Sequence, residues 1–89
     1  MNYLEQIIEE FESNDFFNRS LVVDKNTTIY EVHNQMYAQH LGKFFKLLER
    51  KRRNGWNKFL VLWDTDWVSI YPIDTEEQIK ELYEKTKKE

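Results

Sequence analysis

The first segment of the chain has a helical pattern of hydrophobic and polar positions. Its apolar residues recur at intervals of three and four, and glutamates fall between them: Tyr3, Leu4, Ile7, Ile8 and Phe11 against Glu5, Glu9, Glu10 and Glu12. This period predicts an amphipathic helix over residues 2–12. Residues 13–15 interrupt the pattern, and we expect Phe16 and Phe17 to anchor the next loop on the core.

The following segment, SLVVDKNTTIYEVH, is compatible with two structures. Two runs rich in β-branched residues flank residues 24–26, whose side chains tolerate turns, so we predict a hairpin of residues 20–24 and 27–32. The alternative is a helix that starts at Thr27 or Thr28. It is favoured by apolar residues at helical spacing: Ile29, Val32 and Met36.

A longer helical pattern follows Asn34, a suitable N-cap. Its apolar positions are Tyr37, Leu41, Phe44, Phe45 and Leu48, and it continues into the basic residues 50–53. We expect Asn54 and Gly55 to end this helix, because glycine adopts left-handed φ at the lowest cost. Gly42 is a candidate kink.

The stretch FLVLWDTDWVSIYP, residues 59–72, reads as a second hairpin. A three-residue loop at 64–66 places Trp63 opposite Trp67 and gives the hairpin two apolar faces. The aliphatic face comprises Leu60, Leu62, Val68 and Ile70; the aromatic face comprises Phe59, Val61, Trp63, Trp67 and Tyr71. We expect the first helix to cover the aromatic face and the long and last helices to cover the aliphatic one.

The C-terminal segment predicts one more helix. Pro72 ends the strand, and Asp74 with Glu77 fits a capping box. Ile79, Leu82 and Tyr83 then share one apolar side. The chain is therefore predicted to be a small α+β domain over residues 1–89, in the order αββαββα, with a mainly antiparallel sheet packed by helices.

Composition sets further limits. The 89 residues are 40% hydrophobic and 16% aromatic, which is outside the composition of disordered chains. There is no cysteine, hence no disulfide framework, and no run approaches the ~20 apolar residues that cross a bilayer. The first residues are acidic, unlike a secretory signal, so we expect a cytoplasmic protein without a membrane partner.

The net charge of −3 conceals an uneven distribution. Residues 1–42 contain seven acids and two bases, a balance of −5, and residues 59–89 contain eight acids and four bases, a balance of −4. Residues 43–58 contain one acid and seven bases, a balance of +6. The basic charge is thus concentrated in one short segment.

Asp64 and Asp66 are the strongest candidates for chemistry. FLVLWDTDWV resembles the strand and acidic motif that begin the active site of the haloacid dehalogenase superfamily, where the first acid attacks phosphate beside magnesium. The resemblance covers residues 59–68 only, and that superfamily's sheet is far larger than this chain. Two aspartates that accept hydrogen bonds from the backbone of a turn explain the motif better.

Other catalytic or metal-binding sets are not found in the sequence. His33 and His40 lie seven positions apart, about 10 Å along a continuous helix, too far to share one metal ion. There is no GxSxG, GxGxxG or GxxxxGK[ST] motif. We therefore assign no catalytic residue, metal or cofactor and expect a protein that is not an enzyme.

The basic segment is the strongest functional signal. Its candidate partner-binding residues are Lys46, Arg50, Lys51, Arg52, Arg53, Trp56 and Lys58. Such residues can neutralise phosphates while an exposed Trp56 stacks on a base, or they can meet an acidic protein. The competing interpretation pairs these bases with glutamates of the first and last helices.

The aromatic hairpin face is a second candidate surface, because Trp63, Trp67 and Tyr71 are typical of protein interfaces. We expect a non-enzymatic binding or regulatory module of the inhibitor or adaptor kind that occupies the surface of another protein. One alternative is a nucleic-acid-binding protein that uses residues 43–58. Another is a small metal-dependent enzyme that uses Asp64 and Asp66 with His40. The formation of a homodimer is a further alternative.

Overall fold

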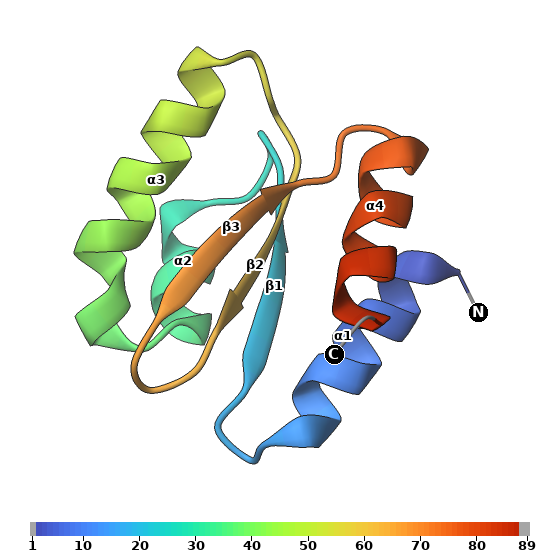
Figure 1. Ribbon diagram of the computed structural model, residues 1–89. Coiled ribbons are helices and arrows are strands. Elements are labelled where there is room, and N and C mark those ends of the chain that lie inside the picture. Colours follow the sequence, from blue (N-terminus) through green and yellow to red (C-terminus); the bar gives the residue numbers. More distant parts are fainter. Residues whose placement is uncertain (1, 88–89) are drawn as a thin grey trace.

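Three antiparallel strands form the centre of the molecule (Figure 1). The computed structural model describes residues 2–87. The strands are β1 (Arg19–Val23), β2 (Phe59–Trp63) and β3 (Val68–Pro72), in the order β1-β2-β3. Because β2 lies between the other two strands and carries helices over both faces, all five of its residues are buried.

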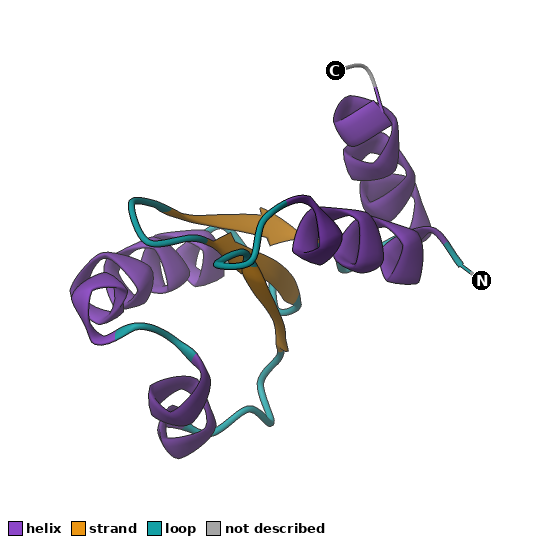
Figure 2. Cartoon of the chain, turned by 90° about the horizontal axis from the view of Figure 1, so that it is seen from below, coloured by secondary structure: helices purple, strands orange, loops and turns teal. Residues whose placement is uncertain are grey.

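Helices cover both faces of this sheet (Figures 1 and 2). One face carries α1 (Tyr3–Asn14) and α4 (Glu76–Lys87); the other carries α2 (Ile29–Gln35), the 3₁₀ turn η1 (Ala38–His40) and α3 (Leu41–Arg53). The predicted α+β class with an antiparallel sheet is confirmed, and the observed order is αβααββα. Among the described residues, no helix is long and apolar enough to cross a membrane.

The predicted second strand, residues 27–32, is wrong. This segment enters α2, as the alternative interpretation has it. Thr28 and Glu31 form a reciprocal capping box: the Glu31 N–H donates to the Thr28 hydroxyl and the Thr28 N–H donates to the Glu31 carboxylate, both at 3.1 Å. This box satisfies two N–H groups that a helix start leaves free. β1 consequently pairs with β2, far along the chain.

The predicted continuous helix from Asn34 is also wrong. α2 ends at Gln35, Met36 and Tyr37 have extended backbones, and α3 begins only at Leu41. Met36 is 5% exposed, so the break buries a side chain in the core instead of continuing the helix. The C-terminal end of α3 is as predicted, since Asn54 is the C-cap and Gly55 has a φ of 95°.

The β2–β3 loop contains four residues rather than the predicted three. Trp63 pairs with Val68, so β3 is shifted by one position relative to the expected register. A shift of one residue turns every side chain of the strand to the opposite face. Val68 and Ile70 therefore join the aromatic side of β2, and Tyr71 lies on the aliphatic side.

Two groups of buried residues stabilise the sheet from its two faces. The group on the α2/α3 face consists of Val23, Val32, Met36, Phe44, Leu48, Phe59, Val61, Trp63, Val68 and Ile70. The group on the α1/α4 face consists of Ile7, Leu60, Leu62, Ile73 and Leu82, with Ile79 and Tyr83 packed against it. The expectation that the first helix covers the aromatic face is thus wrong, while the inward side of the last helix is confirmed.

The start of α4 uses a capping box one position later than predicted. The Gln78 N–H donates to the Thr75 hydroxyl and the Thr75 N–H donates to the Gln78 side chain. Asp74 instead accepts the main-chain N–H groups of Asn57, at 3.0 Å, and Lys58, at 2.5 Å. Its carboxylate therefore joins the loop before α4 to the loop before β2.

Candidate partner-binding site

The predicted basic residues lie at the C-terminal end of α3 and in the loop that follows (Figure 1). Lys46, Arg50, Arg52, Arg53 and Lys58 are exposed, and Lys51 is half-buried. Four consecutive cations in the last turn interact favourably with the partial negative charge of the helix C-terminus. The sequence thus forms a stable helix end that also presents its charge to solvent.

The sheet separates this basic surface from most of the acidic residues. α1 and α4 together contain eight acids and three bases, a balance of −5. α2, η1 and α3 contain two acids and six bases, a balance of +4. Because these groups cover opposite faces, the glutamates of α1 and α4 do not reach the cations of α3.

Ion pairing within the described residues leaves most of the basic surface free. Across residues 2–86, the structure shows one ion pair, between Arg53 and Glu49 on successive turns of α3. Both side chains are largely exposed, 74% and 65%, so the pair contributes well under ~1 kcal/mol. Internal neutralisation, the competing interpretation of the sequence, does not account for the other cations of α3.

Trp56 is not the exposed stacking residue that the sequence suggested. It is half-buried and packs against the core of the α2/α3 face. Its main-chain N–H donates to the Lys51 carbonyl at 3.3 Å, which holds the loop against the end of α3. We therefore assign Trp56 a role in positioning the basic segment.

A groove between α2 and α3 adjoins the basic residues, and the sequence did not predict it. Its inner part, about 160 Å³, is lined by Val23, Thr27, Thr28, Ile29, Val32, Phe45, Leu48 and Arg52. An outer hollow of about 500 Å³ is lined by Phe45, Leu48, Glu49, Arg52 and Arg53. Three residues are common to both parts: Phe45, Leu48 and Arg52.

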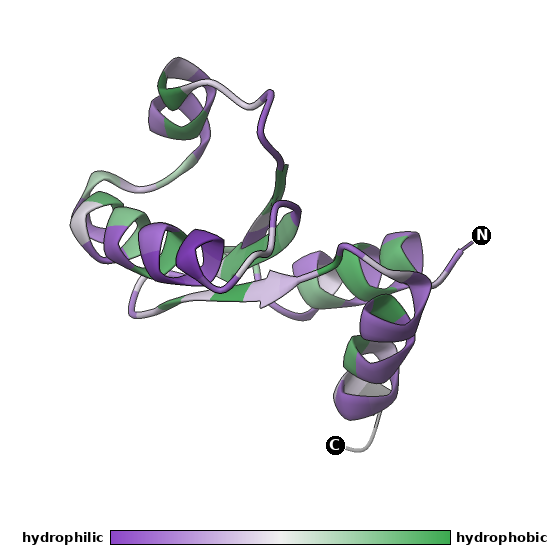
Figure 3. Ribbon diagram, turned by 90° about the horizontal axis from the view of Figure 1, so that it is seen from above, coloured by the Kyte–Doolittle hydropathy of each residue, from purple (hydrophilic) through white to green (hydrophobic). Residues whose placement is uncertain are grey.

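Two exposed apolar residues lie in the first turn of α2. Ile29 lines the inner part of the groove together with Arg52 of α3 and is 66% exposed, and its neighbour in the chain, Tyr30, is 74% exposed. Figure 3 shows hydrophobic positions on α2 and a hydrophilic C-terminal end on α3. The sequence predicts these residues on a strand, so it does not predict that they share a face of the sheet with the basic helix. The signal that reveals them is the T-x-x-E spacing of the capping box at Thr28.

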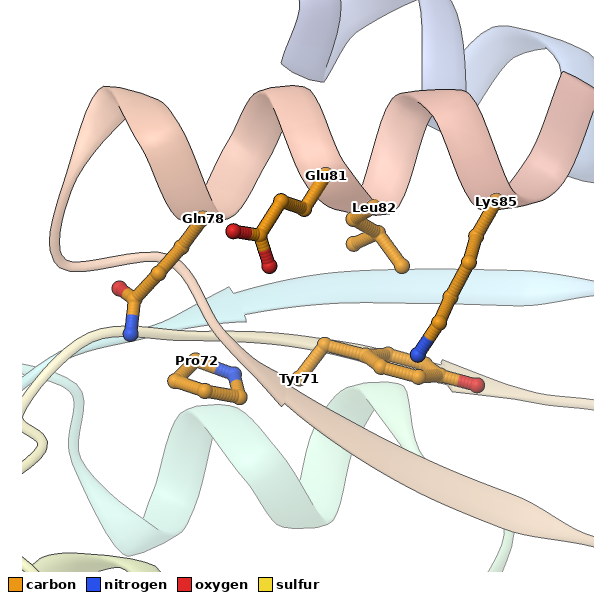
Figure 4. A pocket seen from close by; sticks show the side chains of 6 residues that line it. All are labelled: Tyr71, Pro72, Gln78, Glu81, Leu82 and Lys85. Carbon is orange, nitrogen blue, oxygen red and sulfur yellow. The ribbon is translucent and has the colours of Figure 1, made fainter.

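The three residues of the predicted aromatic surface do not lie together. Trp63 is 1% exposed and belongs to the core of the α2/α3 face, so it is not an interface residue. Trp67 is 37% exposed and contacts the edge of Phe11, with ring centroids 5.7 Å apart. On the other face, Tyr71 borders a hollow of about 210 Å³ with Pro72, Gln78, Glu81, Leu82 and Lys85 (Figure 4).

The α1–β1 loop presents two exposed aromatic side chains. Phe16 is 79% exposed and Phe17 is 51% exposed, so neither is the core anchor that was predicted. Hydrogen bonds fix the loop backbone: the Phe17 N–H donates to Asp15 Oδ1 at 2.9 Å, and the Tyr37 hydroxyl donates to the Phe17 carbonyl at 3.0 Å. Phe16 and Phe17 contact each other edge to face, 5.2 Å apart.

Asp64 and Asp66 form a turn, as predicted. Asp64 Oδ1 accepts the N–H groups of Asp66, at 2.7 Å, and Trp67, at 3.2 Å. The Asp64 carbonyl lies 2.5 Å from Nε2 of the buried His40, and since a carbonyl only accepts, Nε2 carries the proton. Within residues 2–87, no three His, Cys, Asp or Glu side chains are arranged to hold a metal ion.

Comparisons with protein-family models, with curated proteins and with solved structures find no significant match to this chain.

Proposed function

We propose that this protein is a non-enzymatic, cytoplasmic binding module of the inhibitor or adaptor kind. It acts by occupying an acidic surface of another protein with the basic end of α3. The observation that carries the proposal is the separation of charge across the sheet, which leaves Arg50 and Arg52 without a carboxylate partner in the described structure. Arginine is enriched among the residues that dominate protein interfaces.

An acidic protein fits this surface better than a nucleic acid does. The whole chain has a net charge of −3 and a pI near 5.4, whereas nucleic-acid-binding domains usually have a pI above ~9. Glu49 interrupts the basic surface, and Trp56 is not free to stack on bases. The neighbouring Ile29 and Tyr30 add exposed apolar area, which is typical of a protein contact.

Fluorescence anisotropy with two defined probes tests the proposal. We expect a labelled polyglutamate peptide to bind at low salt and labelled single- and double-stranded oligonucleotides not to bind. The triple variant Arg50→Glu, Arg52→Glu, Arg53→Glu should lose the peptide, since it converts three cations of the surface into anions. Oligonucleotide binding that falls steeply with salt would replace the proposal with the nucleic-acid alternative.

A control variant with charge reversals on the opposite side of the sheet separates surface charge from net charge. Lys80→Glu with Lys85→Glu changes two cations on α4, across the sheet from α3. This variant should bind polyglutamate within about twofold of the unchanged protein, because only weak, screened attraction acts over that distance. Equal losses in the two variants would show that the peptide responds to total charge and not to the end of α3.

A further inference from the structure

We propose that the groove between α2 and α3 receives an acidic amphipathic helix of the partner protein. This inference deepens the proposed function and rests on it, because it names the chemical and structural class of the partner segment. The groove buries apolar side chains of the bound helix, and the adjoining arginines favour a helix with acidic residues.

The inner part of the groove lies between α2 and α3 over an apolar floor, and the outer hollow lies on α3 alone. Val32, Phe45 and Leu48 line its inner part, and Phe45 and Leu48 continue into the outer hollow. A helix that packs against two others buries one stripe of side chains, spaced three and four residues apart. The inner part, about 160 Å³, offers room for an apolar side chain of such a stripe, and the outer hollow lies open along α3.

α2 is held in place before any partner arrives. The Thr28–Glu31 capping box fixes its first turn. The preceding turn is fixed by Asp24, whose Oδ1 accepts the Asn26 N–H at 2.8 Å and whose own N–H donates to the Thr27 hydroxyl at 3.0 Å. Ile29 is therefore exposed on a preformed wall, and binding does not have to order it.

The charge beside the groove selects an acidic partner. Arg52 lines both parts of the groove, and Arg53 lines the outer one. Glu49 also lines the outer part, but its carboxylate contacts Arg53, so Arg52 is left to meet an external carboxylate. Glutamates that flank the apolar stripe of a bound helix would lie near this guanidinium.

The probe is a fluorescein-labelled synthetic peptide with leucines at i, i+3, i+4 and i+7 and with glutamate or alanine elsewhere. Three control peptides accompany it: one with the leucines rearranged off a common face, one with alanine for leucine, and one with lysine for glutamate. We expect the amphipathic acidic peptide to bind at least about tenfold more tightly than any control. Amide chemical shifts should change at Ile29, Val32, Phe45, Leu48 and Arg52.

Variants with exposed side chains test the groove without disturbing the core. Ile29→Asp and Arg52→Glu should each weaken the amphipathic peptide about tenfold or more. Phe16→Asp and Lys80→Glu make the same chemical changes elsewhere on the surface and should leave affinity within about twofold. Equal weakening by Phe16→Asp, or chemical-shift changes centred on Phe16 and Phe17, would overturn the assignment of the groove.

The controls also separate this inference from the proposed function. If the leucine-free acidic peptide binds as well as the amphipathic one, the groove assignment fails and recognition of acidic surfaces by α3 stands. If no acidic peptide binds at low salt, both fail. Sedimentation that shows a dimer broken by Ile29→Asp would identify a second copy as the occupant and overturn the partner-helix proposal.

Discussion

The two helix-covered faces of the sheet differ in how much apolar surface and charge they leave exposed. α1 and α4 pack against each other and cross at a steep angle (Figure 2), and the ring centroids of Tyr3 and Tyr83 lie 4.6 Å apart between them. α2 has a single buried residue, Val32, and leaves Ile29 and Tyr30 in solvent beside the groove and the cations of α3. The α1/α4 side packs two of its aromatic rings against each other, and the other side carries exposed apolar area next to cations that a partner can use.

Truncation of a buried side chain on either side should have the largest effect. Phe44→Ala, at a 0% exposed position under α3, should reduce the free energy of unfolding by about 3–5 kcal/mol. Leu82→Ala, at a 7% exposed position on α4, should cost about 2–5 kcal/mol. Urea titration followed by circular dichroism measures both. A negligible loss for Phe44→Ala would mean that α3 does not pack on the sheet as described.

The β2–β3 turn should show an intermediate effect. Asp64→Ala removes the acceptor of two loop N–H groups and should cost about 1–2 kcal/mol of unfolding free energy. Asp64→Asn retains a side-chain oxygen and should cost less. Calorimetry of the unchanged protein with Mg²⁺, Mn²⁺ and Zn²⁺ provides the contrasting test. A saturable heat that Asp64→Ala abolishes would support the metal-dependent alternative instead.

The capping boxes of α2 and α4 allow the same substitution to be made on both sides of the sheet. Thr28→Ala on α2 and Thr75→Ala on α4 each remove the hydroxyl that caps a helix, and each should cost about 1 kcal/mol of stability. Only Thr28→Ala should also weaken the amphipathic acidic peptide, because only α2 borders the groove. The peptide titration is performed on both variants under conditions where each is fully folded. Equal effects on peptide affinity would contradict the functional difference between the two sides.

Exposed apolar residues should show the smallest effect on stability. Ile29→Ala and Phe16→Ala alter side chains that are 66% and 79% exposed, so each should change the unfolding free energy by less than about 0.5 kcal/mol. Thermal melting measures this. A loss above about 2 kcal/mol for Ile29→Ala would show that its side chain stabilises α2 within the free protein.

Long, strongly periodic segments were predictable from the sequence. The N-terminal helix, the presence of two paired strands within residues 59–72 and the basic end of α3 follow from apolar spacing with clear stop signals, while the register of the second strand differs by one residue from the prediction. Residues 27–36 were not, because their short apolar run fits both a strand and a helix. The capping interaction between Thr28 and Glu31 decides the outcome, and the burial of Met36 then ends α2.

The sequence also could not distinguish between local structures that differ by one residue. Asp74–Glu77 and Thr75–Gln78 both fit a capping box, and the structure uses the second because the Asp74 carboxylate holds the loop before β2. Likewise, the sequence DTDW suits a loop of three or four residues, and the backbone bond from the Asp64 N–H to the Trp67 carbonyl, 3.1 Å, selects four. Among the candidate site residues, the basic positions other than Lys51 are exposed, while Trp56 and Trp63 pack into the protein.

The arginines at the end of α3 are assigned to an external partner and not to the stability of the protein itself. The thermal unfolding midpoint of the triple variant Arg50→Gln, Arg52→Gln, Arg53→Gln tests this assignment most directly. Glutamine removes the charge and retains helix propensity. Since these arginines have almost no acidic partner within the described structure, the midpoint should stay within about 4–8 °C, the shift expected from ~1 kcal/mol in a domain of this size. A fall well beyond that range would show that the cations stabilise the protein itself, and would contradict their assignment to an external partner.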